Sequence, residues 1–177
     1  MEKEVYKGKK LQVTEEEYVR PDGTESVYER VYLPTAILII PFLTPDEILF
    51  IREYRRHEIP AVRLKLVTGC YENELSLEEN VNHELQEEAG YRAEKIFLYH
   101  EFKRRNIVTD HKMYAIASGL TKSKIPNPDG EETILGIETI KLDDLYDYVI
   151  AGNYAAGETS FVLLKMLHDL KIGKLRI

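Results

Sequence analysis

The chain has 177 residues, 44% hydrophobic and 31% charged, which fits one globular domain with a sizeable core. Asp and Glu number 31 against 24 Lys and Arg, a net charge of -7 that argues against binding to a nucleic-acid backbone. Its apolar runs are far shorter than the ~20 residues of a membrane span, and the N-terminal MEKEVYKGKK has no apolar signal segment. A lone Cys70 excludes an intramolecular disulfide framework, so we expect a cytoplasmic protein without a membrane or nucleic-acid partner.

The first part of the chain is predicted to form strands. Two β-rich runs, VYKGKKLQVTEEEYVR and SVYERVYL, flank Pro21-Asp22-Gly23, a combination typical of a hairpin turn. TAILIIPFL and ILFIREYR follow as strands separated by a TPDE turn. AVRLKLVT is predicted to be one further short strand that ends at Gly69.

A helix is predicted at 77–89. Ser76 followed by Glu79 is a capping-box pattern, and Gly90 is a natural C-terminal stop. Apolar residues recur every four positions and predict one buried stripe. The stripe consists of Leu77, Val81, Leu85 and Ala89.

The rest of the chain adds strands and two helices. EKIFLYHEFK and DHKMYAIASGL are predicted to pair as strands, and TILGIETIKL forms another. Segments 143–151 and 159–171 have helical periodicity, most clearly in TSFVLLKMLHDLK. Mixed strands combined with three helices indicate an α/β sandwich.

Three carboxylates gather at the end of the first predicted helix. Glu84 and Glu88 are four residues apart and share a face beside the apolar stripe, with Glu87 one step round. Like charges at this spacing destabilise a helix by about 0.2–0.5 kcal/mol per pair, and a divalent cation would remove that penalty. The spacing alone leaves two alternatives open, a metal site and a solvated acidic face.

The stretch from Gly69 to Tyr91 resembles the Nudix box. That box has a Gly, five residues, Glu, seven residues, Arg-Glu, an aliphatic residue, one residue, Glu-Glu, one residue, Gly and a bulky apolar residue. The matching positions are Gly69, Glu84, Leu85, Glu87, Glu88, Gly90 and Tyr91. Leu75 stands in place of the first glutamate and His83 in place of the arginine.

The resemblance extends over most of the chain and is closest to the branch that hydrolyses ADP-ribose and other nucleoside diphosphate sugars. The PDG turn, the arginine-bearing IREYR strand, the LVTG entry to the box and AGETSFVLL carry it. It implies an α/β Nudix fold, an α/β/α sandwich with a mixed β-sheet and an N-terminal antiparallel hairpin. The whole chain, 1–177, would be one Nudix domain, with a hairpin at 1–34 that forms a homodimer and a core at 35–177 that contains the box at 69–91.

The resemblance also implies an activity, metal-dependent hydrolysis of the pyrophosphate bond of a nucleoside diphosphate linked to a sugar. The products would be a nucleoside monophosphate and a sugar phosphate. Glu84 and Glu88 would be the main ligands of Mg²⁺ or Mn²⁺, and Glu87 a further ligand or a supporting group. The Thr68 carbonyl matches a backbone ligand of this branch.

Two further groups of residues are expected to serve the reaction. By resemblance, Glu132 or Glu131 would orient or deprotonate the attacking water, alongside the catalytic Glu88. On an alternating strand, Arg52 points away from Arg55. Arg55 matches the arginine of the family's strand and could grip a phosphate with its fork, and Arg52 is a second candidate substrate contact. The alternative for Arg55 is a charge at the rim, paired with a neighbouring glutamate.

The departures from the box support a second hypothesis. In the family the missing glutamate and arginine pair with each other, so their joint absence at Leu75 and His83 leaves no orphaned charge. Lys65 places a cation near the expected metal ligands. The alternative function is therefore a Nudix-fold module that binds a nucleotide-type ligand without cleaving it.

Overall fold

The computed structural model describes residues 2–56, 58–123, 133–152 and 157–177. Within them the strands are β1 (Lys3–Lys7), β2 (Gln12–Val19), β3 (Glu25–Tyr32), β4 (Ala36–Thr44), β5 (Glu47–Tyr54), β6 (Val62–Lys65), β7 (Val67–Cys70), β8 (Tyr91–Arg92), β9 (Lys95–Arg105), β10 (Val108–Ser118), β11 (Thr121–Lys122) and β12 (Thr133–Lys141). The helices are α1 (Leu77–Glu84), the π-helix η1 (Leu85–Ala89), α2 (Leu142–Ile150) and α3 (Gly157–Lys171). The helix positions agree with the predicted ones to within two residues.

The main sheet is mixed, as predicted. β10 runs parallel to β4 over the register Lys112–Ala36 to Ala117–Pro41 and antiparallel to β9. β5 pairs antiparallel with β12 on its other side. The apolar runs of β4 and β10 therefore lie in the interior of the sheet, which explains why they do not alternate with polar residues.

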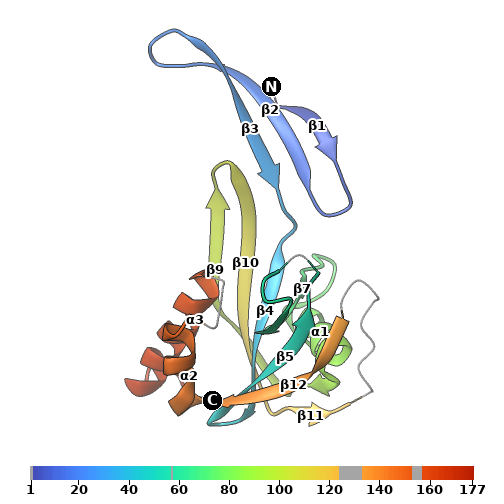
Figure 1. Ribbon diagram of the computed structural model, residues 1–177, viewed down its shortest axis with the longest axis vertical. Coiled ribbons are helices and arrows are strands. Elements are labelled where there is room, and N and C mark those ends of the chain that lie inside the picture. Colours follow the sequence, from blue (N-terminus) through green and yellow to red (C-terminus); the bar gives the residue numbers. More distant parts are fainter. Residues whose placement is uncertain (1, 57, 124–132, 153–156) are drawn as a thin grey trace.

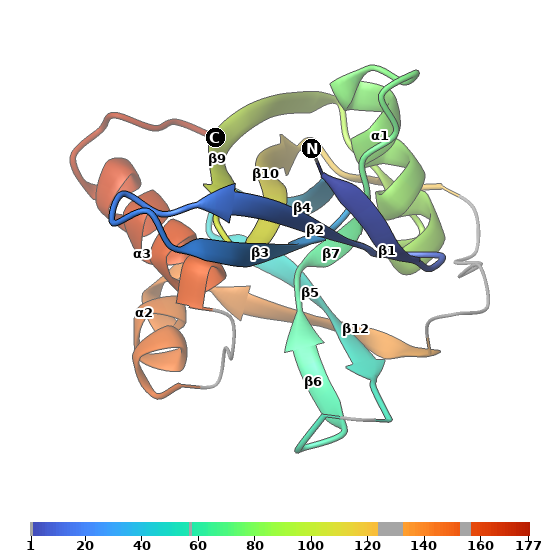
Figure 2. The same cartoon turned by 90° about the horizontal axis from the view of Figure 1, so that it is seen from above.

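Helices cover both faces of this sheet (Figure 2). Alternate residues of β5 point to opposite faces, so Ile48 and Phe50 join the cluster under α2 and α3. Leu49 and Ile51 join the cluster under α1 and η1. Full burial of such a side chain stabilises the fold by about 1.5–3 kcal/mol, so the two clusters hold the three layers together. The predicted α/β/α sandwich is confirmed.

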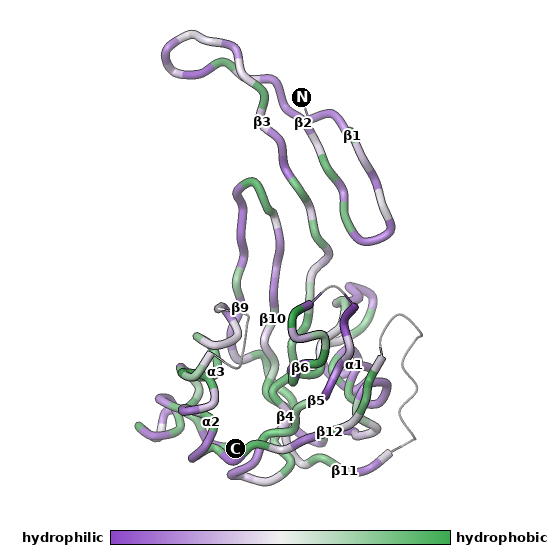
Figure 3. The backbone as a smooth tube through the Cα atoms, viewed as in Figure 1, coloured by the Kyte–Doolittle hydropathy of each residue, from purple (hydrophilic) through white to green (hydrophobic). Residues whose placement is uncertain are grey.

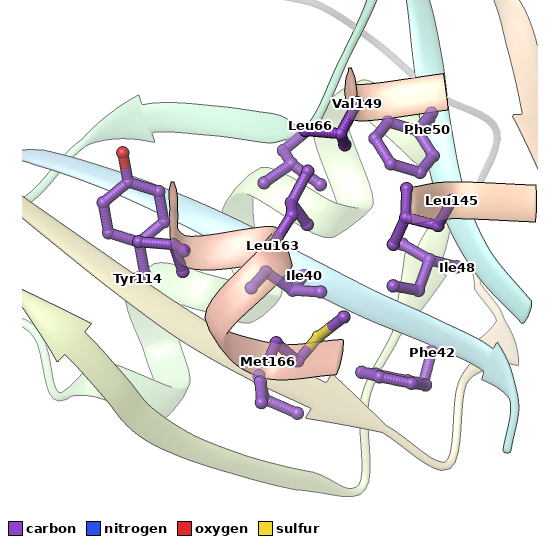
Figure 4. Close-up of a cluster of buried hydrophobic side chains, with 12 residues drawn as sticks. Ile40, Phe42, Ile48, Phe50, Leu66, Tyr114, Leu145, Val149, Leu163 and Met166 are labelled. Atoms are coloured by element: carbon purple, nitrogen blue, oxygen red, sulfur yellow. The ribbon is translucent and has the colours of Figure 1, made fainter. Parts of the chain in front are cut away.

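Figure 4 shows the cluster under α2 and α3, where Leu163 and Met166 of α3 meet Ile40 of β4. Tyr114 is fully buried there, and its hydroxyl group bonds with the Thr159 hydroxyl at 3.0 Å. That bond satisfies the polar end of a large buried ring and fixes the start of α3 against β10.

An ion cluster ties the start of α3 to the β9–β10 hairpin. The Glu158 carboxylate accepts hydrogen bonds from Arg104 and Lys112. Burial by itself would raise the pKa of Glu158, but the hydrogen bonds from Lys112 and Arg104 outweigh it and hold that pKa below its ordinary value. The carboxylate therefore stays charged and keeps its two partners.

The N-terminal strands form an arm that projects from the core (Figure 1). β2 and β3 pair antiparallel from Gln12–Tyr32 to Val19–Glu25, which confirms the predicted hairpin. Gly23 adopts a φ of 86° at the turn, and the Asp22 carboxylate accepts the Thr24 amide at 3.0 Å. Hydrophobic and hydrophilic residues alternate along the arm (Figure 3).

Two segments predicted to be single strands are each divided. The first run forms β1 and β2, joined by a turn in which the Gly8 amide donates to the Leu11 carbonyl. AVRLKLVT forms β6, which pairs with β5, and β7, which pairs with β4. The reason is that β4 and β5 pair only near their shared turn and then diverge, so each offers its own edge.

No helix among the described residues is both long and apolar enough to span a membrane.

Candidate active site

The site is built on α1, whose start is fixed by the sequence. The Ser76 hydroxyl accepts the Glu79 amide at 3.2 Å, and the Glu79 carboxylate accepts the Ser76 amide at 2.8 Å, which confirms the capping box. The hydrogen bond from the Ser76 amide lowers the pKa of Glu79. Buried Asn80 adds a clamp that the sequence did not reveal, since it binds both the amide and the carbonyl of Glu72. These bonds fix the loop that leads from Gly69 into the helix.

The helix does not end as an ordinary α-helix. Leu85–Ala89 form the π-helix η1, which stops at Gly90 with a φ of 72°, as expected of a C-terminal glycine. Bonds from i to i+5 turn each residue less than those of an α-helix, so the carboxylates fan out. Glu84, Glu87 and Glu88 consequently have different neighbours, although the spacing predicts one shared face.

Glu84 lies directly over Gly69 of β7. A Cβ atom at position 69 would lie 1.8 Å from Glu84 Oε1, closer than any side chain tolerates. Gly69 is also held in the sheet, opposite Ile37 of β4. The box glycine is therefore a seat for the Glu84 carboxylate.

Glu88 belongs to a buried ion network. Its Oε1 lies 3.0 Å from Lys65 Nζ, and its Oε2 accepts the Thr68 amide at 2.8 Å. Lys65 Nζ also lies 3.1 Å from Glu53 Oε2, which accepts Arg55 Nε at 2.8 Å. The side chains of Glu88, Glu53 and Lys65 are only 1%, 5% and 15% exposed, so these charges depend on one another for solvation.

His83, Glu84 and Glu87 form a second cluster on the more exposed side. One ligand atom from each lies within 4.8 Å of the other two, and His83 Nε2 is 3.5 Å from Glu87 Oε1. The donor set of two carboxylates and one imidazole, together with the seat that Gly69 leaves for Glu84, fits a divalent cation.

The two candidate arginines are not brought together. Arg55 joins Glu53 on the face that α1 covers, and it also approaches Glu58 at 3.8 Å. Arg52 lies on the other face, where its Nη1 is 2.6 Å from Glu138 Oε1. There it lines a hollow of about 520 Å³ with Tyr148, so the expectation that Arg52 acts beside the carboxylates is not supported by its placement.

Of the other predicted residues, Thr68 lies against Glu88 through its amide, while its hydroxyl donates to the Leu66 carbonyl at 2.9 Å. Glu131 and Glu132 lie outside the described residues. A hollow of about 480 Å³ beside α1 is lined by both residues that depart from the box, Leu75 and His83. Sequence reasoning had given this hollow no role.

Comparison with known proteins agrees with this geometry. The profile of the NUDIX domain family matches residues 32–159. A solved structure described as an ADP compounds hydrolase superposes with a TM-score of 0.78 at 19% sequence identity, covering 100% of this chain and 95% of that one. No curated protein matches by sequence. The chain therefore belongs to the Nudix superfamily of pyrophosphohydrolases, as the box at 69–91 predicts.

Proposed function

We propose that the protein hydrolyses the pyrophosphate bond of a nucleoside diphosphate linked to a sugar, of the ADP-ribose kind, in a reaction that needs Mg²⁺ or Mn²⁺. The observation that carries the proposal is the carboxylate set Glu84, Glu87 and Glu88, held against β6 and β7 with Gly69 shaped to receive Glu84. The similar fold of a protein described as an ADP compounds hydrolase supports the substrate class. A cytoplasmic location is part of this proposal.

The residues of the chain divide the work. Glu84, Glu87, Glu88 and the Thr68 carbonyl would hold the cation, which when bound neutralises charge on the phosphoryl oxygens. Arg55, with its guanidinium beside the network, would bind a phosphate through its remaining N–H groups.

The chemical step needs a base for water. Water attacks one phosphorus atom, the bridging P–O bond breaks, and a nucleoside monophosphate and a sugar phosphate leave. We assign the proton of that water to Glu132 or Glu131, which the resemblance places in the loop before β12.

The test is a panel of nucleotide sugars assayed with Mg²⁺ and with Mn²⁺, for the native chain and for Glu88→Gln. We expect metal-dependent release of a nucleoside monophosphate from at least one compound, and a loss on the order of 100-fold in Glu88→Gln, since the amide is a poor metal ligand. Glu74→Gln, an exposed change in the same box, should leave the rate unaltered.

One observation favours the alternative function, a module that binds without cleaving. Lys65 already neutralises Glu88, so a cation near this carboxylate meets a resident ammonium group. Binding of a nucleotide sugar without turnover, unaffected by Glu88→Gln, would establish the module and refute the hydrolase.

We also propose that residues 1–34 form a homodimer arm and residues 35–177 the Nudix core. The arm exposes apolar side chains on its strands, among them Val19 and Val27, which lie on one face of the β2–β3 hairpin. A thin sheet of this kind gains stability by packing against another surface, and a second copy supplies the same arm.

Sedimentation velocity tests the dimer. Val19→Lys combined with Val27→Lys is expected to convert dimers to monomers, because each change would bury a charge in the interface. Ile172→Lys, an equally exposed apolar position after α3, is the control and should remain dimeric. A native chain that sediments as a monomer would contradict the proposal.

A further inference from the structure

The two box departures and the buried lysine point to one feature, the identity of the bound cation. Both oxygens of Glu88 have partners in the protein, Lys65 Nζ and the Thr68 amide. The helix side that faces Lys65 is therefore already supplied with positive charge. The donors that remain for a metal ion on this helix are on the side of His83.

His83 is placed to act as a donor. Its ligand atom lies within 4.8 Å of those of Glu84 and Glu87. Ligands around one ion sit about 2.0–2.2 Å from it, hence up to roughly 4 Å from one another, so small side-chain rotations suffice to close the set. A box arginine at this position could not donate a lone pair, whereas an imidazole can.

The cluster also leaves room for other ligands. The side chains of His83 and Glu87 are 52% and 30% exposed. The hollow of about 480 Å³ adjoins His83, with Leu75 contributing an apolar wall. Three protein donors with open positions are typical of a catalytic metal site, in which water or substrate completes the coordination.

We propose that His83 is a ligand of the divalent cation, together with Glu84 and Glu87, and that this site selects a first-row transition-metal ion such as Co²⁺, Zn²⁺ or Mn²⁺ over Mg²⁺. The physical reason is the donor set: Mg²⁺ takes oxygen ligands, whereas an imidazole nitrogen favours softer ions. The inference refines the metal requirement of the proposed function and rests on it only for its relevance to catalysis.

The test is calorimetric titration of the metal-stripped full-length protein with Co²⁺ and with Mg²⁺, and a parallel Co²⁺ titration followed by visible d–d absorption. We expect Co²⁺ to bind at least about tenfold tighter than Mg²⁺, and His83→Gln to weaken Co²⁺ binding by about tenfold or more while changing Mg²⁺ binding little. The absorption spectrum of bound Co²⁺ should change as well, since a nitrogen ligand is lost.

His111→Gln is the matched control, because His111 also pairs with a glutamate, its Nε2 being 2.7 Å from Glu101 Oε2. It should bind Co²⁺ like the native chain. Equal Co²⁺ affinity and spectra for the native chain and His83→Gln would show that His83 only forms a surface ion pair with Glu87 and would overturn the inference, as would Mg²⁺ binding as tight as Co²⁺.

Failure of the inference can be told from failure of the proposed function. Hydrolysis that is equally fast with Mg²⁺ and unaltered in His83→Gln would overturn the inference and keep the function. Cation binding through His83 without turnover of any nucleotide sugar would do the reverse.

Discussion

Replacing Lys65 by methionine is expected to lower the free energy of unfolding by about 3–5 kcal/mol, since the change leaves two buried carboxylates without their shared cation. Methionine preserves most of the volume of the lysine stem, so the loss is one of charge. Glu53 and Glu88 would then face each other across the gap that the ammonium group fills, at 3.1 and 3.0 Å from it. Urea denaturation in a metal-free buffer measures the difference.

Two comparisons make this result specific. Lys95→Met, an exposed change on β9, should alter the free energy of unfolding by less than about 0.5 kcal/mol. Addition of Mg²⁺ should restore part of the stability of Lys65→Met and less of the native chain's, because only the variant offers an uncompensated carboxylate pair. If Lys65→Met unfolds at the native urea concentration, the network does not carry the stability assigned to it.

Gly69→Ala is expected to reduce turnover on the order of 100-fold while leaving the fold largely intact. The added Cβ would overlap the Glu84 carboxylate, and the end of that side chain can rotate away, whereas the β7 backbone is held by β4. A displacement of about 1 Å at a catalytic group is enough for a loss of this size. The measurements are the hydrolysis rate on a compound that the native chain cleaves, and the urea midpoint.

The control for this change is Gly157→Ala, because an added Cβ at this first residue of α3 would meet no atom within 4 Å. It should keep the native rate. Gly69→Ala with a native rate and native cation affinity would mean that the position of Glu84 is not critical. A large fall in the urea midpoint would instead locate the cost of the change in the sheet.

The features that the sequence predicted depend on neighbours along the chain. Ser76 and Glu79 are three residues apart, Gly90 terminates its own helix, and Pro21-Asp22-Gly23 closes its own hairpin. Local spacing carries such information. The opposite orientation of Arg52 and Arg55 followed from strand alternation for the same reason.

The features that the sequence did not reveal depend on distant pairings. Lys65 meets Glu88, 23 positions away, only because β6 lies beside β5 and under η1. The division of AVRLKLVT between two partners depends on where β4 and β5 separate. A residue's type and its neighbours in sequence do not specify such partners.

The π-helix η1 has a consequence for insertions and deletions in the box. Such a helix is equivalent to an α-helix that carries one additional residue, and each residue of an α-helix rotates the chain by about 100°. A deletion within Leu85–Ala89 would restore ordinary helical bonding and rotate everything after it. Glu88 would turn away from Lys65 and Gly90 would leave its stop position. The number of residues between Glu84 and Gly90 is therefore as much a part of the site as their identities.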